Sequence, residues 1–166
     1  MKSPSPGYKA LRRFRSSVHQ QVYLLTTTTM NRQPIFHDWC SGRVVVNTIR
    51  KLASDELVDS LAFVVMPDHL HWLVALRDRP LAHVVQRMKG ASAYRLNRSR
   101  SAGGRIWQPG YHEHAVRRQE ELRKLARYIV LNPVRAGLVT KVANYPLWDS
   151  VWVDGDWPDR GGSLPP

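Results

Sequence analysis

The chain has 166 residues, with 25 Lys and Arg against 13 Asp and Glu, so its formal net charge is +12. This length fits one domain that buries its own core, and the single cysteine, Cys40, excludes an internal disulfide. No stretch approaches the length of a membrane-spanning helix, which argues against membrane insertion and secretion and makes the cytoplasm, at the nucleoid, the expected location.

The first part of the chain is predicted to hold a basic arm, one strand and one helix. Residues 1–17 should be a flexible arm, because their prolines oppose regular structure and no apolar period is present. The run VYLLTTTTM, Val22 to Met30, is rich in β-branched and aromatic residues and predicts a first strand. Apolar residues recur at helical spacing between Ser41 and Leu57, which predicts a helix there.

Two strands and a second helix are predicted in the centre of the chain. Residues 59–66 and 69–76 have the composition of strands and are separated by a break at Pro67 and Asp68. Because so short a connection joins antiparallel neighbours, these two strands should pair with each other. An amphipathic pattern over 81–97 predicts the helix, which ends in the basic run RSRSAGGR.

The last elements complete the pattern of an α+β fold. A fourth strand is predicted over 111–116, and a third helix over 120–131 that Pro133 terminates. The order β-α-β-β-α-β followed by a helix predicts a ferredoxin-like domain over 18–153, with a four-stranded antiparallel sheet, helices on one face and the other face free for a ligand. The polar, Pro- and Gly-rich residues 154–166 should form a disordered tail.

The third predicted strand carries a His-x-His pair, His69 and His71. Side chains at i and i+2 of a strand share a face, so both imidazoles should point together while Leu70 and Trp72 point to the opposite face. If Leu70 and Trp72 lie in the core, the histidines occupy the open sheet face and form half of a divalent metal site. Two surface histidines that only form hydrogen bonds are an equally good interpretation of the pair alone.

A second pair, His112 and His114, lies in the run GYHEHAV. These two side chains should also share a face of their strand. They could be metal ligands, phosphate contacts or plain surface residues. We favour the roles without a metal, because the glycine before Tyr111 and the charge of Glu113 indicate a less buried strand. His114 remains a candidate for DNA contact.

The third predicted helix carries Tyr128, with Asn132 four residues later. Positions i and i+4 share a helix face, so both side chains point to one site if the helix continues that far. A phenol has a pKa of about 10, so a nucleophilic tyrosine needs a nearby cation or base, which a metal held by two histidines would supply. Taken alone, Tyr128 fits an aromatic residue at the edge of the core, and Asn132 before proline fits a helix C-terminal cap.

The excess of positive charge predicts a polyanionic partner, most often a nucleic acid, although incidental binding by a basic protein is an alternative. The clustering of the basic residues favours a nucleic acid. Trp107, Tyr94 and Tyr111 are candidates for stacking on unpaired bases, with buried packing as the alternative for each. The expected DNA contacts are Arg12, Arg13, Arg98, Arg100, Arg105, His114, Arg117, Arg118 and Arg127.

Three segments resemble a known family over roughly Val22 to Val153. They are YLLTTTTMNRQPIF near the start, FVVMPDHLHWLVAL at 63–76 and IWQPGYHEHAVRRQEELRKLARYIVLNPVRAGLV at 106–139. In this order they resemble the REP-associated tyrosine transposases, a branch of the single-tyrosine His-hydrophobe-His (HUH) nucleases. The resemblance implies that His69, His71 and Asn132 are ligands of Mg²⁺ or Mn²⁺ and that Tyr128 is the nucleophile.

The resemblance also implies a reaction and a partner. Family members bind single-stranded DNA hairpins at palindromic repeats and cut and rejoin the strand through a 5′-phosphotyrosine. One chain can supply both the histidines and the tyrosine, which favours a monomer over a homodimer. Two other functions remain open: a nucleic-acid-binding module without chemistry, and a metal-dependent phosphodiesterase that uses water, with Tyr128 structural.

Overall fold

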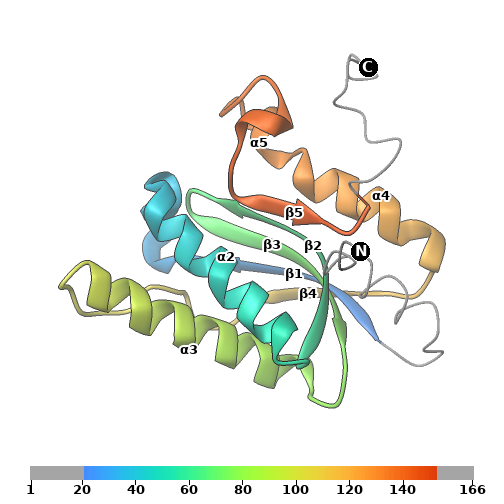
Figure 1. Cartoon of the computed structure of the whole chain (residues 1–166), viewed down its shortest axis with the longest axis horizontal. Helices are drawn as coiled ribbons and strands as arrows, with labels where there is room; N and C mark the ends of the chain where they lie inside the picture. The colour runs from blue at the N-terminus through green and yellow to red at the C-terminus, as the bar shows by residue number, and fades with distance from the viewer. Residues whose placement is uncertain (1–20, 153–166) are drawn as a thin grey trace, which may run out of the picture.

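The computed structural model describes residues 21–152, so the arm predicted over 1–17 and the tail predicted over 154–166 lie outside the described residues. A five-stranded antiparallel sheet forms the centre of the fold, with the strand order β4-β1-β3-β2-β5 (Figure 1). Its strands are β1 (Val22–Thr28), β2 (Val58–Met66), β3 (His69–Leu76), β4 (His112–Val116) and β5 (Trp148–Ser150).

Three helices follow the predicted order, with ends that differ from the predicted ones by up to three residues, and a short fourth helix was not predicted. The α-helices are α2 (Trp39–Ser54), α3 (Leu81–Ser99), α4 (Gln119–Val130) and α5 (Asn132–Arg135). Three short 3-10 helices lie in the connecting segments. They are η1 (Met30–Arg32) and η2 (Ile35–His37), between β1 and α2, and η3 (Val142–Asn144), between α5 and β5. The α+β class is confirmed, and the elements run β-α-β-β-α-β before α4. Within residues 21–152 no helix is long and apolar enough to cross a membrane.

The prediction of four strands is wrong, because β5 pairs with the outer edge of β2. Ser150 lies opposite Ala62, and the backbone N–H of Val65 donates to Leu147 O at 2.8 Å just before the strand begins. Three residues are too few to show the alternation of apolar and polar side chains by which a strand is recognised in a sequence.

The N-terminus of α2 lies two residues before the predicted helix, and a side-chain cap explains why. The carboxylate of Asp38 accepts hydrogen bonds from the backbone N–H groups of Cys40 and Ser41 at 3.2 and 3.1 Å. These donors would otherwise have no partner in the first helical turn. The hydrogen bonds from Ser41 and Cys40 also lower the pKa of the Asp38 carboxyl.

Helices cover both faces of the sheet, so the second face is less open than predicted. Figure 1 shows α2 and α3 side by side across the sheet and α4 next to β5. Both α2 and α4 contact β2, and nearly every residue of β2 is buried, so these two helices lie on opposite faces. The apolar stripe of α4 explains its position, since Leu122, Ala126 and Ile129 are buried against the sheet. Within the described part of the chain, the residues of β4 are mostly exposed.

Candidate active site

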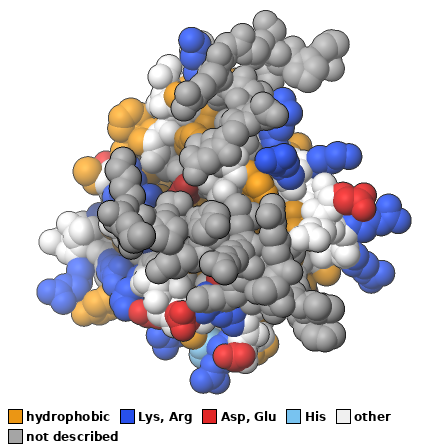
Figure 2. Space-filling model, turned by 45° about the vertical axis from the view of Figure 1, so that its right-hand side comes forward, with side chains coloured by type: hydrophobic (Ala, Val, Ile, Leu, Met, Phe, Trp, Pro, Cys, Tyr) orange, Lys and Arg blue, Asp and Glu red, His pale blue; other side chains and the backbone are white. Residues whose placement is uncertain are grey.

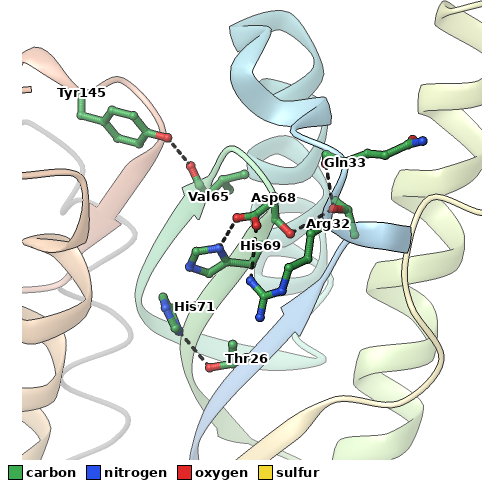
Figure 3. A network of polar contacts seen from close by, with 9 residues as sticks. Thr26, Arg32, Gln33, Val65, Asp68, His69, His71 and Tyr145 are labelled. Carbon is green, nitrogen blue, oxygen red and sulfur yellow. Dashed lines mark hydrogen bonds and ion pairs between the residues drawn. The ribbon is translucent and has the colours of Figure 1, made fainter. Parts of the chain in front are cut away.

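His69 and His71 form a pair at the start of β3, with ring centroids 4.8 Å apart and ring planes nearly perpendicular at 85°. Leu70 and Trp72 alternate with them and are fully buried on the opposite face, as predicted. In Figure 3 both imidazoles point toward the side of the sheet on which the C-terminal helices lie, and α3 lies on the other side. The histidines therefore face the layer that contains α4.

Each imidazole is held at Nδ1 by a neighbouring side chain (Figure 3). His69 Nδ1 lies 2.5 Å from Asp68 Oδ1, and His71 Nδ1 lies 2.8 Å from Thr26 Oγ1. A carboxylate only accepts, so Nδ1 of His69 carries the proton and Nε2 keeps its lone pair. The Thr26 hydroxyl can accept from His71 in the same way. Metal-binding histidines are usually oriented by such a contact on the second ring nitrogen.

Thr26 reaches His71 because of the sheet register. The two residues are direct partners in the antiparallel pairing of β1 with β3. Side chains opposite one another on neighbouring strands project from the same face, about 5 Å apart at Cβ. Thr26 cannot be identified from the sequence, because the register that places it there is not visible in either strand alone.

Asp68 lies in the two-residue turn between β2 and β3 and is fixed by several contacts. Its backbone carbonyl accepts hydrogen bonds from the N–H and the hydroxyl of Thr29 at 2.9 and 3.1 Å, and its carboxylate lies 3.4 Å from Nη1 of Arg32. Partial burial opposes ionisation of Asp68, but the hydrogen bond and charge of His69 and the charge of Arg32 outweigh it, so the pKa lies below its ordinary value. The sequence analysis assigned Asp68 only to a turn, although its position directly before the first histidine was a signal for this role.

The environment of His71 keeps its imidazole neutral. Burial, the neighbouring His69 and the charge of Arg135 lower the pKa of His71 to about 4. A neutral imidazole is the form that binds a metal ion. The described residues contain no group of three His, Cys, Asp or Glu side chains placed to share a metal ion. A third protein ligand from this part of the chain would therefore be of another type, such as an amide oxygen.

Tyr128 lies on α4 with 55% of its surface exposed. No residue between 21 and 152 forms a hydrogen bond with its hydroxyl. Tyr145 is a contrast, because it donates to the carbonyl of Val65 at 2.7 Å and burial raises its pKa to about 12. Of these two tyrosines, only Tyr128 has a hydroxyl that a substrate can reach.

Asn132 follows Tyr128 on a helical path that continues past the end of α4. Leu131 keeps right-handed helical angles, and its N–H donates to Arg127 O at 3.1 Å. Pro133 has no N–H to donate to Ile129 O, and the side-chain Nδ2 of Asn132 donates to that carbonyl at 3.0 Å instead. The C-cap residue of α4 is Leu131 and Asn132 begins α5, so Asn132 is not the cap itself but bonds through its NH₂ group to a carbonyl at the end of α4. Its Oδ1 has no partner within the described part of the chain, so its role as a metal ligand remains a prediction.

Arg135 is a neighbour of Tyr128 that the sequence analysis missed. Its guanidinium carbon lies 4.0 Å from the centroid of the Tyr128 ring, and its Nη2 donates to the Tyr128 carbonyl. The spacing of Tyr128, Asn132 and Arg135 at i, i+4 and i+7 was the available signal, since these positions share a helix face.

The second histidine pair lies on the same sheet face as the first. His112 is the β4 partner of Thr26, and His114 is the partner of Leu24, on the opposite side of β1 from β3. Two strand spacings, about 10 Å, separate the backbones of His112 and His71, and the described residues contain no group of three His, Cys, Asp or Glu that joins the two pairs at one metal ion. Both residues of the second pair are exposed, as expected for a strand without a buried metal site.

The predicted DNA contacts come from several elements. Arg98 lies at the end of α3, Arg100 and Arg105 lie in the loop after it, and Arg127 lies on α4 directly before Tyr128. Figure 2 shows Lys and Arg side chains protruding at several places around one face of the molecule. Arg12 and Arg13 lie outside the described residues. The exposed candidates are Arg98, Arg100, Arg105, His114, Arg117, Arg118 and Arg127.

One of the three candidates for base stacking is excluded. Trp107 is only 4% exposed, packs against Phe36 and donates from Nε1 to Ser92 Oγ at 3.0 Å. Of the two alternatives for Trp107, buried packing is confirmed, because its ring belongs to the core. Tyr94 is exposed beside Arg98 on α3, and Tyr111 is half-buried.

Comparisons with known proteins identify relatives over most of the described chain. The REP-associated tyrosine transposase of Escherichia coli K12 is 29% identical over 102 residues, covering 60% of this chain and 59% of that protein. A Haemophilus influenzae relative is 27% identical over 99 residues, covering 53% of this chain and 56% of its own length. The matched part thus spans little more than half the length of these curated relatives.

A solved structure and a family model agree with these relatives. The structure of a REP-associated tyrosine transposase bound to a REP hairpin has a TM-score of 0.64 and 25% sequence identity, covering 77% of this chain and 75% of that chain. The model of IS200-like transposases matches residues 17–132, which include the histidine pair, Tyr128 and Asn132. The chain belongs to the IS200-like transposase family, and its resemblance to the REP-associated tyrosine transposases is confirmed.

Proposed function

We propose that the chain is a metal-dependent endonuclease and strand transferase for single-stranded DNA, with Tyr128 as its nucleophile. One observation carries the proposal: two imidazoles, each anchored at Nδ1, face the side of the sheet on which α4 holds an exposed Tyr128. The nucleophile and the two nitrogen ligands that the reaction needs thus come from α4 and β3 of one chain.

The donor set fits a divalent cation. Nε2 of His69, Nε2 of His71 and Oδ1 of Asn132 would hold Mg²⁺ or Mn²⁺, with water or phosphate oxygens completing the coordination. When bound, the cation polarises the phosphate oxygens and supplies positive charge beside the scissile bond. The hydrogen bonds of the two Nδ1 atoms with Asp68 and Thr26 support this role because they leave both Nε2 atoms free.

The proposed reaction is a transesterification at phosphorus. The oxygen of Tyr128 forms a bond to phosphorus as its proton passes to solvent, and the bond from phosphorus to the 3′ oxygen breaks. The products are a 5′-phosphotyrosine and a free 3′-hydroxyl. The number of phosphodiester bonds is unchanged, so a second 3′-hydroxyl can attack the phosphotyrosine and reseal the strand without ATP.

The proposed substrate is a palindromic hairpin within single-stranded DNA. A relative with the same fold has been solved bound to a REP hairpin, and this chain carries a net charge of +12, which suits a phosphate backbone. We propose that the exposed arginines of α3 and of the segment after β4 contact that backbone.

A covalent adduct tests the proposal against the two other functions. Hairpin DNA labelled at its 3′ end should become attached to the protein, and Tyr128→Phe should abolish both attachment and cleavage. Cleavage without attachment would support water as the nucleophile, and binding without cleavage would support a module without chemistry.

A further inference from the structure

Arg135 contacts both the ring and the backbone of Tyr128. Its guanidinium carbon lies 4.0 Å from the ring centroid, and its Nη2 donates to the carbonyl oxygen of the same residue. Both side chains are exposed, so burial does not force them together. The arrangement places a fixed positive charge against the face of the proposed nucleophile.

The local backbone explains this contact. Leu131 remains helical between α4 and α5, and the N–H of Arg135 donates to Leu131 O at 3.0 Å. Tyr128, Asn132 and Arg135 therefore project from one face of a nearly continuous helical path. Arg135 therefore lies beside the proposed nucleophile and on the helix face that carries Asn132.

Most of the hydrogen-bonding capacity of Arg135 is unused. A guanidinium has five N–H donors in a planar fork, and the Tyr128 carbonyl is the only acceptor for Arg135 within residues 21–152. No Asp or Glu in that range forms an ion pair with Arg135. The remaining donors suit a phosphate, whose oxygens match the fork geometry.

We propose that Arg135 is a further catalytic residue, which binds the non-bridging oxygens of the scissile phosphate and holds phosphorus in reach of the Tyr128 oxygen. This inference rests on the proposed function. A guanidinium stays protonated in proteins, so Arg135 is not the base that accepts the phenolic proton. It stabilises the negative charge that spreads onto the non-bridging oxygens during attack.

The experiment compares Arg135→Ala, Arg135→Gln and Arg135→Lys with the unmodified chain in single-turnover adduct formation on hairpin DNA with Mn²⁺. Each protein is also given DNA with a neutral methylphosphonate at the scissile position. On natural DNA we expect a rate loss of about 100-fold for Ala and Gln and a smaller loss, about tenfold, for Lys. On methylphosphonate DNA the charged oxygen is absent, so Arg135→Ala and the unmodified chain should react within about threefold of each other.

Arg43→Ala is the matched control. Arg43 is exposed on α2 and also donates to a backbone carbonyl, that of Pro146, at 3.3 Å, but it does not contact a tyrosine ring. This variant should react at the unmodified rate. If Arg135→Ala does not fold, Arg135→Lys still provides a test. It keeps the positive charge but lacks the planar set of guanidinium donors.

Two results would overturn the inference while leaving the proposed function intact. One is adduct formation by Arg135→Ala at close to the unmodified rate on natural DNA. The other is an equal loss on natural and methylphosphonate DNA, which would make Arg135 a structural support for the end of α4. If the unmodified chain forms no adduct with natural DNA, the proposed function fails and this inference fails with it.

Discussion

The carboxylate of Asp68 accepts a hydrogen bond from Nδ1 of His69, the next residue in the chain, over a distance of 2.5 Å. The contact is possible because Asp68 lies in the turn and His69 is the first residue of β3. It fixes both the tautomer and the orientation of the imidazole, so Nε2 faces the site with its lone pair available. The neighbouring Arg32 adds a weaker, mostly exposed ion pair to the same carboxylate.

Replacing Asp68 with Asn should weaken metal binding. Asn keeps the shape of the side chain but loses the charge that holds the Nδ1 proton, and such changes around metal sites typically reduce affinity by about 10- to 100-fold. Isothermal titration calorimetry, in which Mn²⁺ is added to the metal-free protein, measures this loss of affinity. Arg32→Gln is the control, because it removes the exposed ion pair and leaves the His69 contact. Equal affinities for Asp68→Asn and the unmodified chain would show that Asp68 does not orient a ligand.

Replacing Thr26 with Val should also weaken metal binding, by about tenfold. Valine has the same shape but leaves Nδ1 of His71 without its partner, whereas Thr26→Ser keeps a hydroxyl and should preserve affinity. Thr28→Val is a matched control on the same strand, because Thr28 lies opposite His69 and its hydroxyl is not bonded to that imidazole. If Thr28→Val lowers Mn²⁺ affinity as much as Thr26→Val does, the effect comes from β1 in general and not from the His71 contact.

The stability of the metal-free protein should fall as pH decreases from about 6.5 toward about 4. Burial is the main cause that lowers the pKa of His71 to about 4, from an ordinary value of 6.5. The unfolded chain therefore takes up a proton in this window that the folded chain does not, and protonation favours unfolding. The titration of Asp68 changes the stability only below this window, because the pKa of its carboxyl is lowered from the ordinary value of 3.8. Thermal midpoints measured in EDTA should fall less between pH 7 and 5 for His71→Asn than for the unmodified chain, and parallel curves would contradict the assignment.

Mn²⁺ should support adduct formation at a lower concentration than Mg²⁺. Two of the three proposed ligands are imidazole nitrogens, and Mg²⁺ prefers oxygen ligands in a strict octahedron. Rates measured against the concentration of each metal give the comparison, and excess EDTA should abolish the reaction. A lower half-maximal concentration for Mg²⁺ would indicate a ligand set richer in oxygen than His69, His71 and Asn132.

Periodic elements were predictable from the sequence, and contacts between elements were not. The ranges of β2, β3 and α3 follow from their apolar patterns, and the common face of His69 and His71 follows from the period of a strand. The strand β5 is too short to show a period. The packing of α4 on the histidine face depends on which surface its apolar stripe covers, which the pattern alone does not specify.

The residues around the predicted ligands were missed for the same reason. Thr26 reaches His71 through the register of β1 with β3, and register is a property of two strands together. Arg135 reaches Tyr128 because the helical path continues through Leu131 to α5, although Pro133 predicts that the helix ends. The family resemblance predicts roles for four residues, and the structure adds side chains that contact three of them: Asp68, Thr26 and Arg135.

The most direct test of the account is to map the covalent attachment of DNA to a single residue by mass spectrometry. The protein is incubated with hairpin DNA and Mn²⁺, and the DNA is trimmed with nuclease before digestion with trypsin. Cleavage after Arg127 and Arg135 releases residues 128–135, YIVLNPVR, in which Tyr128 is the only tyrosine. The account predicts a nucleotide attached through its 5′ phosphate to this peptide. Attachment to a peptide containing Tyr94 or Tyr111 instead, or cleaved DNA without any modified peptide, would contradict it.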